Sequence, residues 1–163
     1  MLKAIRLFAG IALLITATAS AETTVKRDDK EKITLVTTKT EVDGKNKPAF
    51  IFSLGIQDTG KTVSIDDSVA TAIVVQGKVA GCGQIFFVAG DAQKLFPITG
   101  RETYGDTATR LHIGNVRLGD VRFIATSIEK ASIQTCDKTH KLGKQYAKDF
   151  NEFLDAVNKA AAQ

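Results

Sequence analysis

The amino-acid sequence predicts an α+β protein: an antiparallel β-sheet of about six to eight strands, arranged as a sandwich or part-barrel, with a C-terminal amphipathic helix and one disulfide. Val, Ile and Thr make up more than a quarter of residues 22–163, and β-branched side chains favour strands. Short apolar segments separated by Gly and Asp turn signals fill residues 32–136, which predicts strands there. The end of the chain has helical periodicity instead.

The first 21 residues have the features of a signal peptide. Lys3 and Arg6 precede an apolar run at residues 7–15, and Ala19-Ser20-Ala21 is a small-residue cleavage site. We therefore expect cleavage near Ala21 and a periplasmic or secreted protein. Nothing after residue 21 approaches the length of a membrane span, so no transmembrane segment is expected. Cleavage lowers the net charge from +4 to +2, which argues against a nucleic-acid-binding protein.

After the signal peptide, residues 22–31 are charged and aperiodic, which predicts a flexible leader, and residues 32–163 are expected to form one globular domain. Its first element is a hairpin around Asp43-Gly44, a two-residue turn signal. Pairing outward from this turn places Leu35 opposite Phe52, so that one face of both strands is apolar.

Three further strands are expected in the middle of the chain. A loop at residues 58–60 leads into a strand near 61–65, and residues 69–79 and 84–89 follow. The last two segments are apolar on both sides, which predicts that both of their faces are buried. A helix over residues 66–76 remains an alternative.

The following region is predicted to combine a long loop with another hairpin. Residues 91–106 lack clear periodicity and form the expected connection. Strands are predicted at 107–113 and 116–133, the second segment folding back at Gly119-Asp120, with a bulge at Gly114-Asn115.

A C-terminal helix over about residues 141–161 is predicted by one apolar stripe at helical spacing: Leu142, Tyr146, Phe150, Phe153, Leu154, Val157 and Ala161. We expect this stripe to pack on the apolar face of the sheet, with a partner-binding helix as the alternative.

The two cysteines, Cys82 and Cys136, allow one connectivity, and an oxidising compartment favours its formation. The bond would close a loop of about 55 residues and contribute roughly 4 kcal/mol. Neither cysteine belongs to a Cys-x-x-Cys pair. Together with His112 and His140 they match no known metal-ligand spacing, so no metal or cofactor is expected.

Two motifs match catalytic patterns in letters but not in predicted context. Residues 55–62 fit the P-loop pattern, yet a strand and an acidic turn are expected where a phosphate-binding helix should begin. Ser127 and Lys130 fit Ser-x-x-Lys, but on a strand their side chains would point to opposite faces. With no nucleophile elbow near His112 or His140, we predict no catalytic residues. A hydrolase without a recognisable motif remains an alternative.

Basic residues are the strongest candidates for binding. Arg117 would lie opposite Arg122 in the predicted hairpin, where two like charges favour an anionic partner. Lys94, Arg101 and Tyr104 lie in the predicted long connection. A second basic group surrounds the start of the helix: Lys138, His140, Lys141, Lys144 and Lys148.

These observations predict an exported, non-catalytic binding protein of the bacterial cell envelope. Its partner would be an envelope protein or an anionic cell-surface component. A carrier of a small apolar ligand, with a cavity lined by Phe86, Phe87 and Phe123, is the alternative. The oligomeric state cannot be deduced from the sequence.

Overall fold

The computed structural model describes residues 21–40, 47–57, 62–79, 81–135 and 138–163. Along these residues the elements are β1 (Glu22–Asp28), β2 (Ile33–Lys39), β3 (Ala49–Gln57), β4 (Ala70–Gln76), β5 (Gln84–Ala89), β6 (Ala92–Tyr104), β7 (Ala108–Ile113), α1 (Leu118–Ser127), the 3₁₀ helix η1 (Ile128–Lys130), β8 (Ala131–Thr135), β9 (Lys138–Lys141) and α2 (Gln145–Ala161). None of the helices in these ranges is long and apolar enough to cross a membrane.

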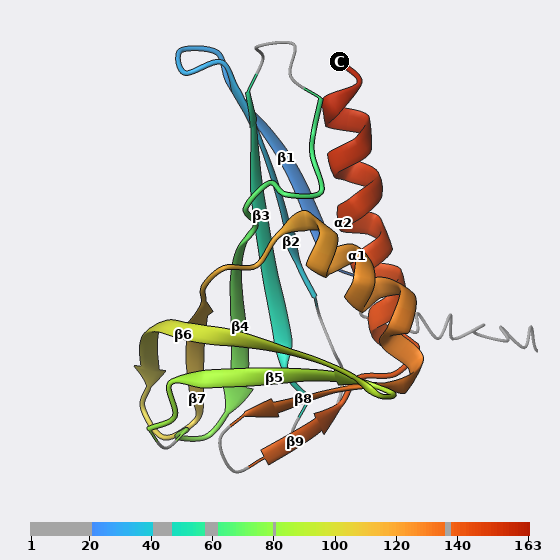
Figure 1. The fold of residues 1–163 in the computed structure, drawn as a ribbon. Helices are drawn as coiled ribbons and strands as arrows, with labels where there is room; N and C mark the ends of the chain where they lie inside the picture. The colour runs from blue at the N-terminus through green and yellow to red at the C-terminus, as the bar shows by residue number, and fades with distance from the viewer. Residues whose placement is uncertain (1–20, 41–46, 58–61, 80, 136–137) are drawn as a thin grey trace, which may run out of the picture.

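All nine strands of the described residues belong to one antiparallel sheet, in the order β1-β2-β3-β4-β7-β6-β5-β8-β9. The sheet is strongly twisted: β1, β2 and β3 run nearly upright in Figure 1, whereas β5, β6, β8 and β9 cross below them. The inner face of the sheet shares one apolar core with both α-helices. The predicted α+β class is confirmed, with one twisted sheet of nine strands and a second helix.

The C-terminal helix α2 packs its aromatic stripe on β3. Phe50 and Phe52 point from β3 toward Tyr146, Phe150 and Phe153, with ring centroids 4.8–5.5 Å apart. All five side chains are at most 2% exposed. Mostly edge-to-face rings of this kind add to the hydrophobic gain from burial. The predicted helix and its packing on the sheet are therefore confirmed.

The first hairpin has a different register from the one predicted. Val36 lies opposite Leu54 and Thr38 lies opposite Phe52, a shift of three residues. Because the shift is odd, the other face of β2 turns inward. Val36 and Thr38 are fully buried, whereas Leu35 is 42% exposed. The predicted turn at Asp43-Gly44 lies outside the described residues.

Helix α1 replaces the predicted hairpin around Gly119-Asp120. Leu118, Val121, Ile124 and Ala125 recur at helical spacing and are all buried. Burial of this stripe outweighs the low helix propensity of its β-branched residues, which is a weak preference. The prediction of strands across residues 116–133 was therefore wrong over α1 and η1, and held only for β8 at their end.

Two segments that were not expected to form strands, residues 22–31 and 91–106, each contain one. Glu22–Asp28 is not a flexible leader but β1, paired with β2 along all seven residues. The predicted connection at 91–106 contains β6, which pairs with β5 through its first half and with β7 through its second. The ladder shifts register between Ile98 and Gly100, where the chain passes from one neighbour to the other. This irregularity, rather than Gly114-Asn115, is the bulge.

The remaining sequence predictions have mixed outcomes. Strands β4, β5 and β7 are confirmed, which excludes the alternative helix over residues 66–76. Residues 62–65 form no strand, and the chain turns at Ile65 and Asp66. The loop at 58–60 and residues 1–20 lie outside the described residues, as does Cys136. Export and the disulfide therefore stay predictions.

Candidate binding surface

The interior of the sheet is closely packed. Between the inner face and α1 the structure leaves a cavity of about 20 Å³, lined by Phe50, Phe52, Thr71, Ile73, Ile85, Phe87, Phe96, Ile113, Val116, Ile124 and Ile133. This volume is close to that of one water molecule and far below the few hundred Å³ of a typical ligand pocket. Of the aromatic residues considered for a carrier, Phe87 and Phe123 lie together on the inner side with ring centroids 6.1 Å apart, whereas Phe86 projects from the opposite face of β5.

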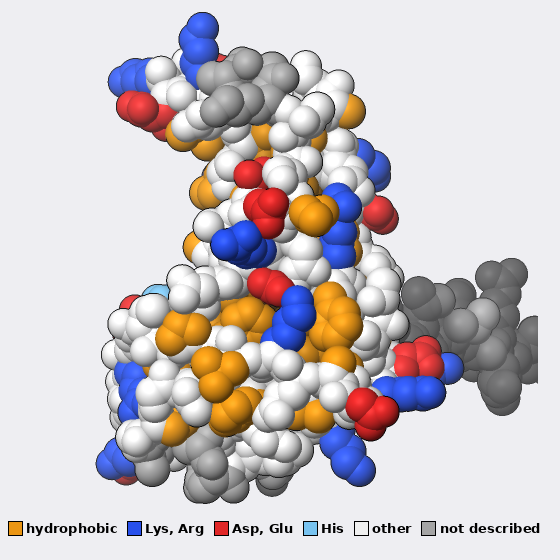
Figure 2. All heavy atoms as spheres, in the orientation of Figure 1, with side chains coloured by type: hydrophobic (Ala, Val, Ile, Leu, Met, Phe, Trp, Pro, Cys, Tyr) orange, Lys and Arg blue, Asp and Glu red, His pale blue; other side chains and the backbone are white. Residues whose placement is uncertain are grey.

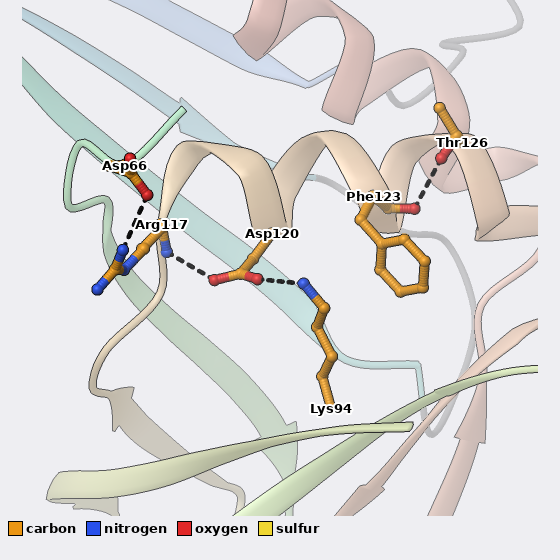
Figure 3. A network of polar contacts seen from close by, with 6 residues as sticks. All are labelled: Asp66, Lys94, Arg117, Asp120, Phe123 and Thr126. Carbon is orange, nitrogen blue, oxygen red and sulfur yellow. Dashed lines mark hydrogen bonds and ion pairs between the residues drawn. The ribbon is translucent and has the colours of Figure 1, made fainter. Parts of the chain in front are cut away.

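Two of the predicted basic residues meet at the start of α1 (Figure 3). Lys94 Nζ lies 2.5 Å from Asp120 Oδ1 and 4.9 Å from the ring centroid of Phe123. Asp120 Oδ2 accepts a hydrogen bond of 2.9 Å from the backbone N–H of Arg117, and the Arg117 guanidinium lies 2.8 Å from Asp66 Oδ1. Both cations already have a carboxylate partner. The network therefore attaches the start of α1 to β6 and to the turn at Asp66.

Arg122 does not lie opposite Arg117. The two residues are five positions apart at the start of α1, and Arg122 Nη2 donates a hydrogen bond of 3.4 Å to Asn158 Oδ1 of α2. The cross-strand pair of like charges, which suggested an anion site, is absent because the segment is helical.

Tyr104 belongs to a second polar cluster, on the outer face of β6 and β7. Its hydroxyl donates a hydrogen bond of 2.7 Å to Glu102 Oε2, and His112 Nε2 lies 2.9 Å from Glu102 Oε1. The Arg110 guanidinium lies 3.7 Å from Glu102. The hydrogen bonds from Tyr104 and His112, helped by the charge of Arg110, lower the pKa of the Glu102 carboxyl. Arg101 precedes Glu102 on β6 and projects from the other face.

The second basic group is also dispersed. Lys138 and Lys141 are exposed on the edge strand β9, and His140 between them is 9% exposed. Lys144 precedes α2 and lies 3.7 Å from Glu129. The structure therefore does not gather the predicted cations into one site: some are paired with carboxylates, and the others lie apart. No cluster of three or more potential metal ligands occurs within the described ranges.

The two letter-matching motifs have different contexts: the P-loop-like segment lacks a following helix in the described residues 62–67, whereas Ser127 and Lys130 lie in helical segments. Gly55 lies inside β3, and the described residues 62–67 that follow contain no helix. Ser127 ends α1 and Lys130 ends η1, so the expectation of a strand was wrong here. Both line a surface groove of about 370 Å³. Among the described residues no hydrogen bond joins the two side chains, whereas an activated serine is hydrogen-bonded to its base.

A surface that the sequence analysis missed lies on the outer side of β5 and β6. Phe86 is opposite Leu95, and the neighbouring residues Val88 and Pro97 project from the same face. Leu95 is 51% exposed, and the other three side chains are partly exposed. We call these four residues the β5–β6 face. Figure 2 shows hydrophobic side chains gathered over β5 and β6.

The β5–β6 face is apolar although it is not needed for the core. The alternate residues of the same strands, Ile85, Phe87 and Phe96, fill the core on the inner side. The two helices pack on that inner side and leave the outer side uncovered. The signal was visible in the unbroken apolar run of residues 85–89, which was interpreted as a strand buried on both faces.

Comparisons with known proteins identify no relative: no family model, no curated protein and no solved structure matches the chain.

Proposed function

We propose that this chain is an exported, non-catalytic binding protein of the bacterial cell envelope that holds a protein partner on the β5–β6 face. The observation that carries the proposal is the apolar outer surface of β5 and β6, with Leu95 half-exposed at its centre, beside a core that is already closely packed. Exposed apolar side chains grouped on one face are typical of sites for protein contact.

The surroundings of this face favour a protein over an anionic polymer. Gln84, Gln93 and Gln134 are exposed in register with the apolar residues and form an uncharged polar rim. Aromatic and aliphatic side chains within a polar rim are the usual composition of a protein interface. The cations that suggested an anionic partner, Lys94 and Arg117, are instead ion-paired with carboxylates.

Export and the disulfide are part of the same proposal. The signal-like residues 1–21 support export. Strands β5 and β8 support the disulfide, because Ile85 lies opposite Thr135 and each is a near neighbour of one cysteine in the sequence. The expected intact mass is that of residues 22–163 less two hydrogens, which corresponds to a cleaved chain with one disulfide. A mass that includes residues 1–21 would contradict cleavage near Ala21.

Photo-crosslinking in intact cells tests the partner site. A photoreactive phenylalanine analogue at position 95 is expected to give a discrete protein adduct. The matched controls are position 65, where Ile65 is 57% exposed in a turn, and position 35, where Leu35 is 42% exposed on β2. Phe86→Asp should abolish the adduct from position 95, because it places a charge at the centre of the apolar face. No adduct from position 95, or the same adducts from all three positions, would overturn the proposal.

A further inference from the structure

The edge strand β1 has one neighbour, β2, and its other side is open among the described residues. An unpaired strand edge is a template for pairing with another chain. The opposite edge, β9, has four residues and carries charges of one sign, Lys138 and Lys141, which protect against such pairing, whereas the charges of β1 are of both signs and can pair with each other across two copies. β1 has seven residues, and Val25 at its middle is 53% exposed.

A groove runs beside this open edge. It has a volume of about 430 Å³ between β1 and α2 and is lined by Thr23, Val25, Glu152, Asp155, Ala156, Lys159, Ala160 and Gln163. Its β1 side is the inner face of the strand, because the hydroxyl of Thr23 lies 2.9 Å from that of the buried Thr38. Its α2 side is a stripe at helical spacing with acidic residues in the first part and Lys159 in the second.

We propose that a second copy of this chain pairs its β1 antiparallel to this edge, joining the two sheets into one. Thr24 would lie opposite Thr24 of the copy, on the two-fold axis. Val25 would then lie opposite Thr23, and the exposed valine would be covered.

The charged residues of β1 favour the register centred on Thr24 over the other symmetric registers. A two-fold axis perpendicular to the sheet must pass between identical residues, and three such registers overlap at least five residues of β1. Centring on Val25 places Glu22 opposite Asp28 twice, and centring on Lys26 places two lysines opposite each other. Centring on Thr24 places Glu22 opposite Lys26 twice, on the face away from α2.

The groove supplies a second complementary layer. Glu152, Asp155 and Lys159 line the groove. The two-fold axis would make α2 of the copy antiparallel, so that Lys159 of each copy would face Glu152 and Asp155 of the other. Helix α2 packs mainly over β2. In the dimer, β2 of one copy and β2 of the other would be three strand spacings apart, so the α2 helices of the two copies would be about 14 Å apart. Directly packed helices are closer, about 8–10 Å apart, so long charged side chains would bridge the gap.

Sedimentation velocity of the exported chain at low salt tests this dimer. The wild-type chain is expected to dimerise. Glu22→Lys or Lys26→Glu alone should raise the dissociation constant of the dimer by about tenfold or more. Each variant places like charges at positions 22 and 26 opposite each other, and the two-fold axis makes two such pairs. The double variant Glu22→Lys/Lys26→Glu should regain most of the affinity, because opposite charges again face each other. Lys30→Glu, the matched control outside the paired residues, should leave the dissociation constant unchanged.

A second measurement locates the axis. Thr24→Cys should be joined across the dimer by a short bifunctional maleimide, and Asp28→Cys should not. A wild-type chain that is monomeric at about 100 μM would overturn the proposal. So would a dimer in which the double charge exchange fails to restore affinity, or in which the Asp28→Cys variant crosslinks as readily as the Thr24→Cys variant.

Discussion

Truncation of Phe150 is expected to remove a large part of the stability of the fold. Phe150 is fully buried in α2, and its ring centroid lies 5.2 Å from that of Phe50 and 4.8 Å from that of Phe52. Phe→Ala at a buried site costs about 3–5 kcal/mol, from lost transfer free energy and from the cavity that remains. Because two edge-to-face contacts are also lost, we expect Phe150→Ala to lie in the upper part of that range.

Urea unfolding followed by far-UV circular dichroism measures this change. With a slope of about 2 kcal/mol per molar, a loss of about 4 kcal/mol shifts the midpoint by about 2 M. Leu154→Ala is the matched control, since Leu154 is on the same helix but only partly buried. Its expected loss is less than half as large. A loss below about 1 kcal/mol for Phe150→Ala, or equal losses for both variants, would refute the packing of α2 on β3.

Three further changes test other parts of the structure. Asp120→Ala removes the cap of the Arg117 N–H and should cost about 0.5–2 kcal/mol, with faster amide exchange in the first turn of α1. A hairpin in that segment would show no such local effect. Burial, and then the charge of Asp149, raises the pKa of the Tyr146 phenol, so the folded state keeps a proton that the unfolded state releases. The free energy of unfolding should therefore fall as the pH rises above about 10, and should fall less steeply in Tyr146→Phe; equal slopes would contradict the burial of this hydroxyl. Tyr104→Phe should raise the pKa of Glu102 toward its ordinary value in an NMR titration, because the hydrogen bond that lowers this pKa most is lost. An unchanged titration would exclude that hydrogen bond.

The parts of the fold that were predicted correctly have strong local patterns. The apolar stripe of α2 is long, and it includes three aromatic residues that can be buried only on one side. Strands β4 and β5 are short apolar runs between small or turn-forming residues. In these segments, local propensity and tertiary packing favour the same structure.

The errors occurred where long-range packing decides the structure. In α1, Val121, Ile124 and Thr126 favour a strand locally, and Gly119-Asp120 resembles a turn, but the helical face is covered by the core. In β6, Pro97 and Gly100 resemble loop residues. They are tolerated because the strand changes neighbours at this point and its ladder is interrupted.

The candidate surface was missed for a related reason. A continuous apolar strand is compatible with burial on both faces or with one buried and one exposed face, and periodicity cannot separate the two. The choice depends on where α1 and α2 pack, because they cover Phe87 and leave Phe86 on the uncovered side. The predicted basic residues do not form one site because Lys94 and Arg117 form ion pairs with Asp120 and Asp66, which are remote from them in the sequence.

We propose that this protein acts through its surface and not through an interior ligand. Native mass spectrometry of chain exported to and purified from a bacterial periplasm tests it most directly. The packed interior, with a cavity of about 20 Å³, predicts protein masses without a small-molecule adduct. A stoichiometric bound small molecule that survives purification would contradict the claim and favour a carrier.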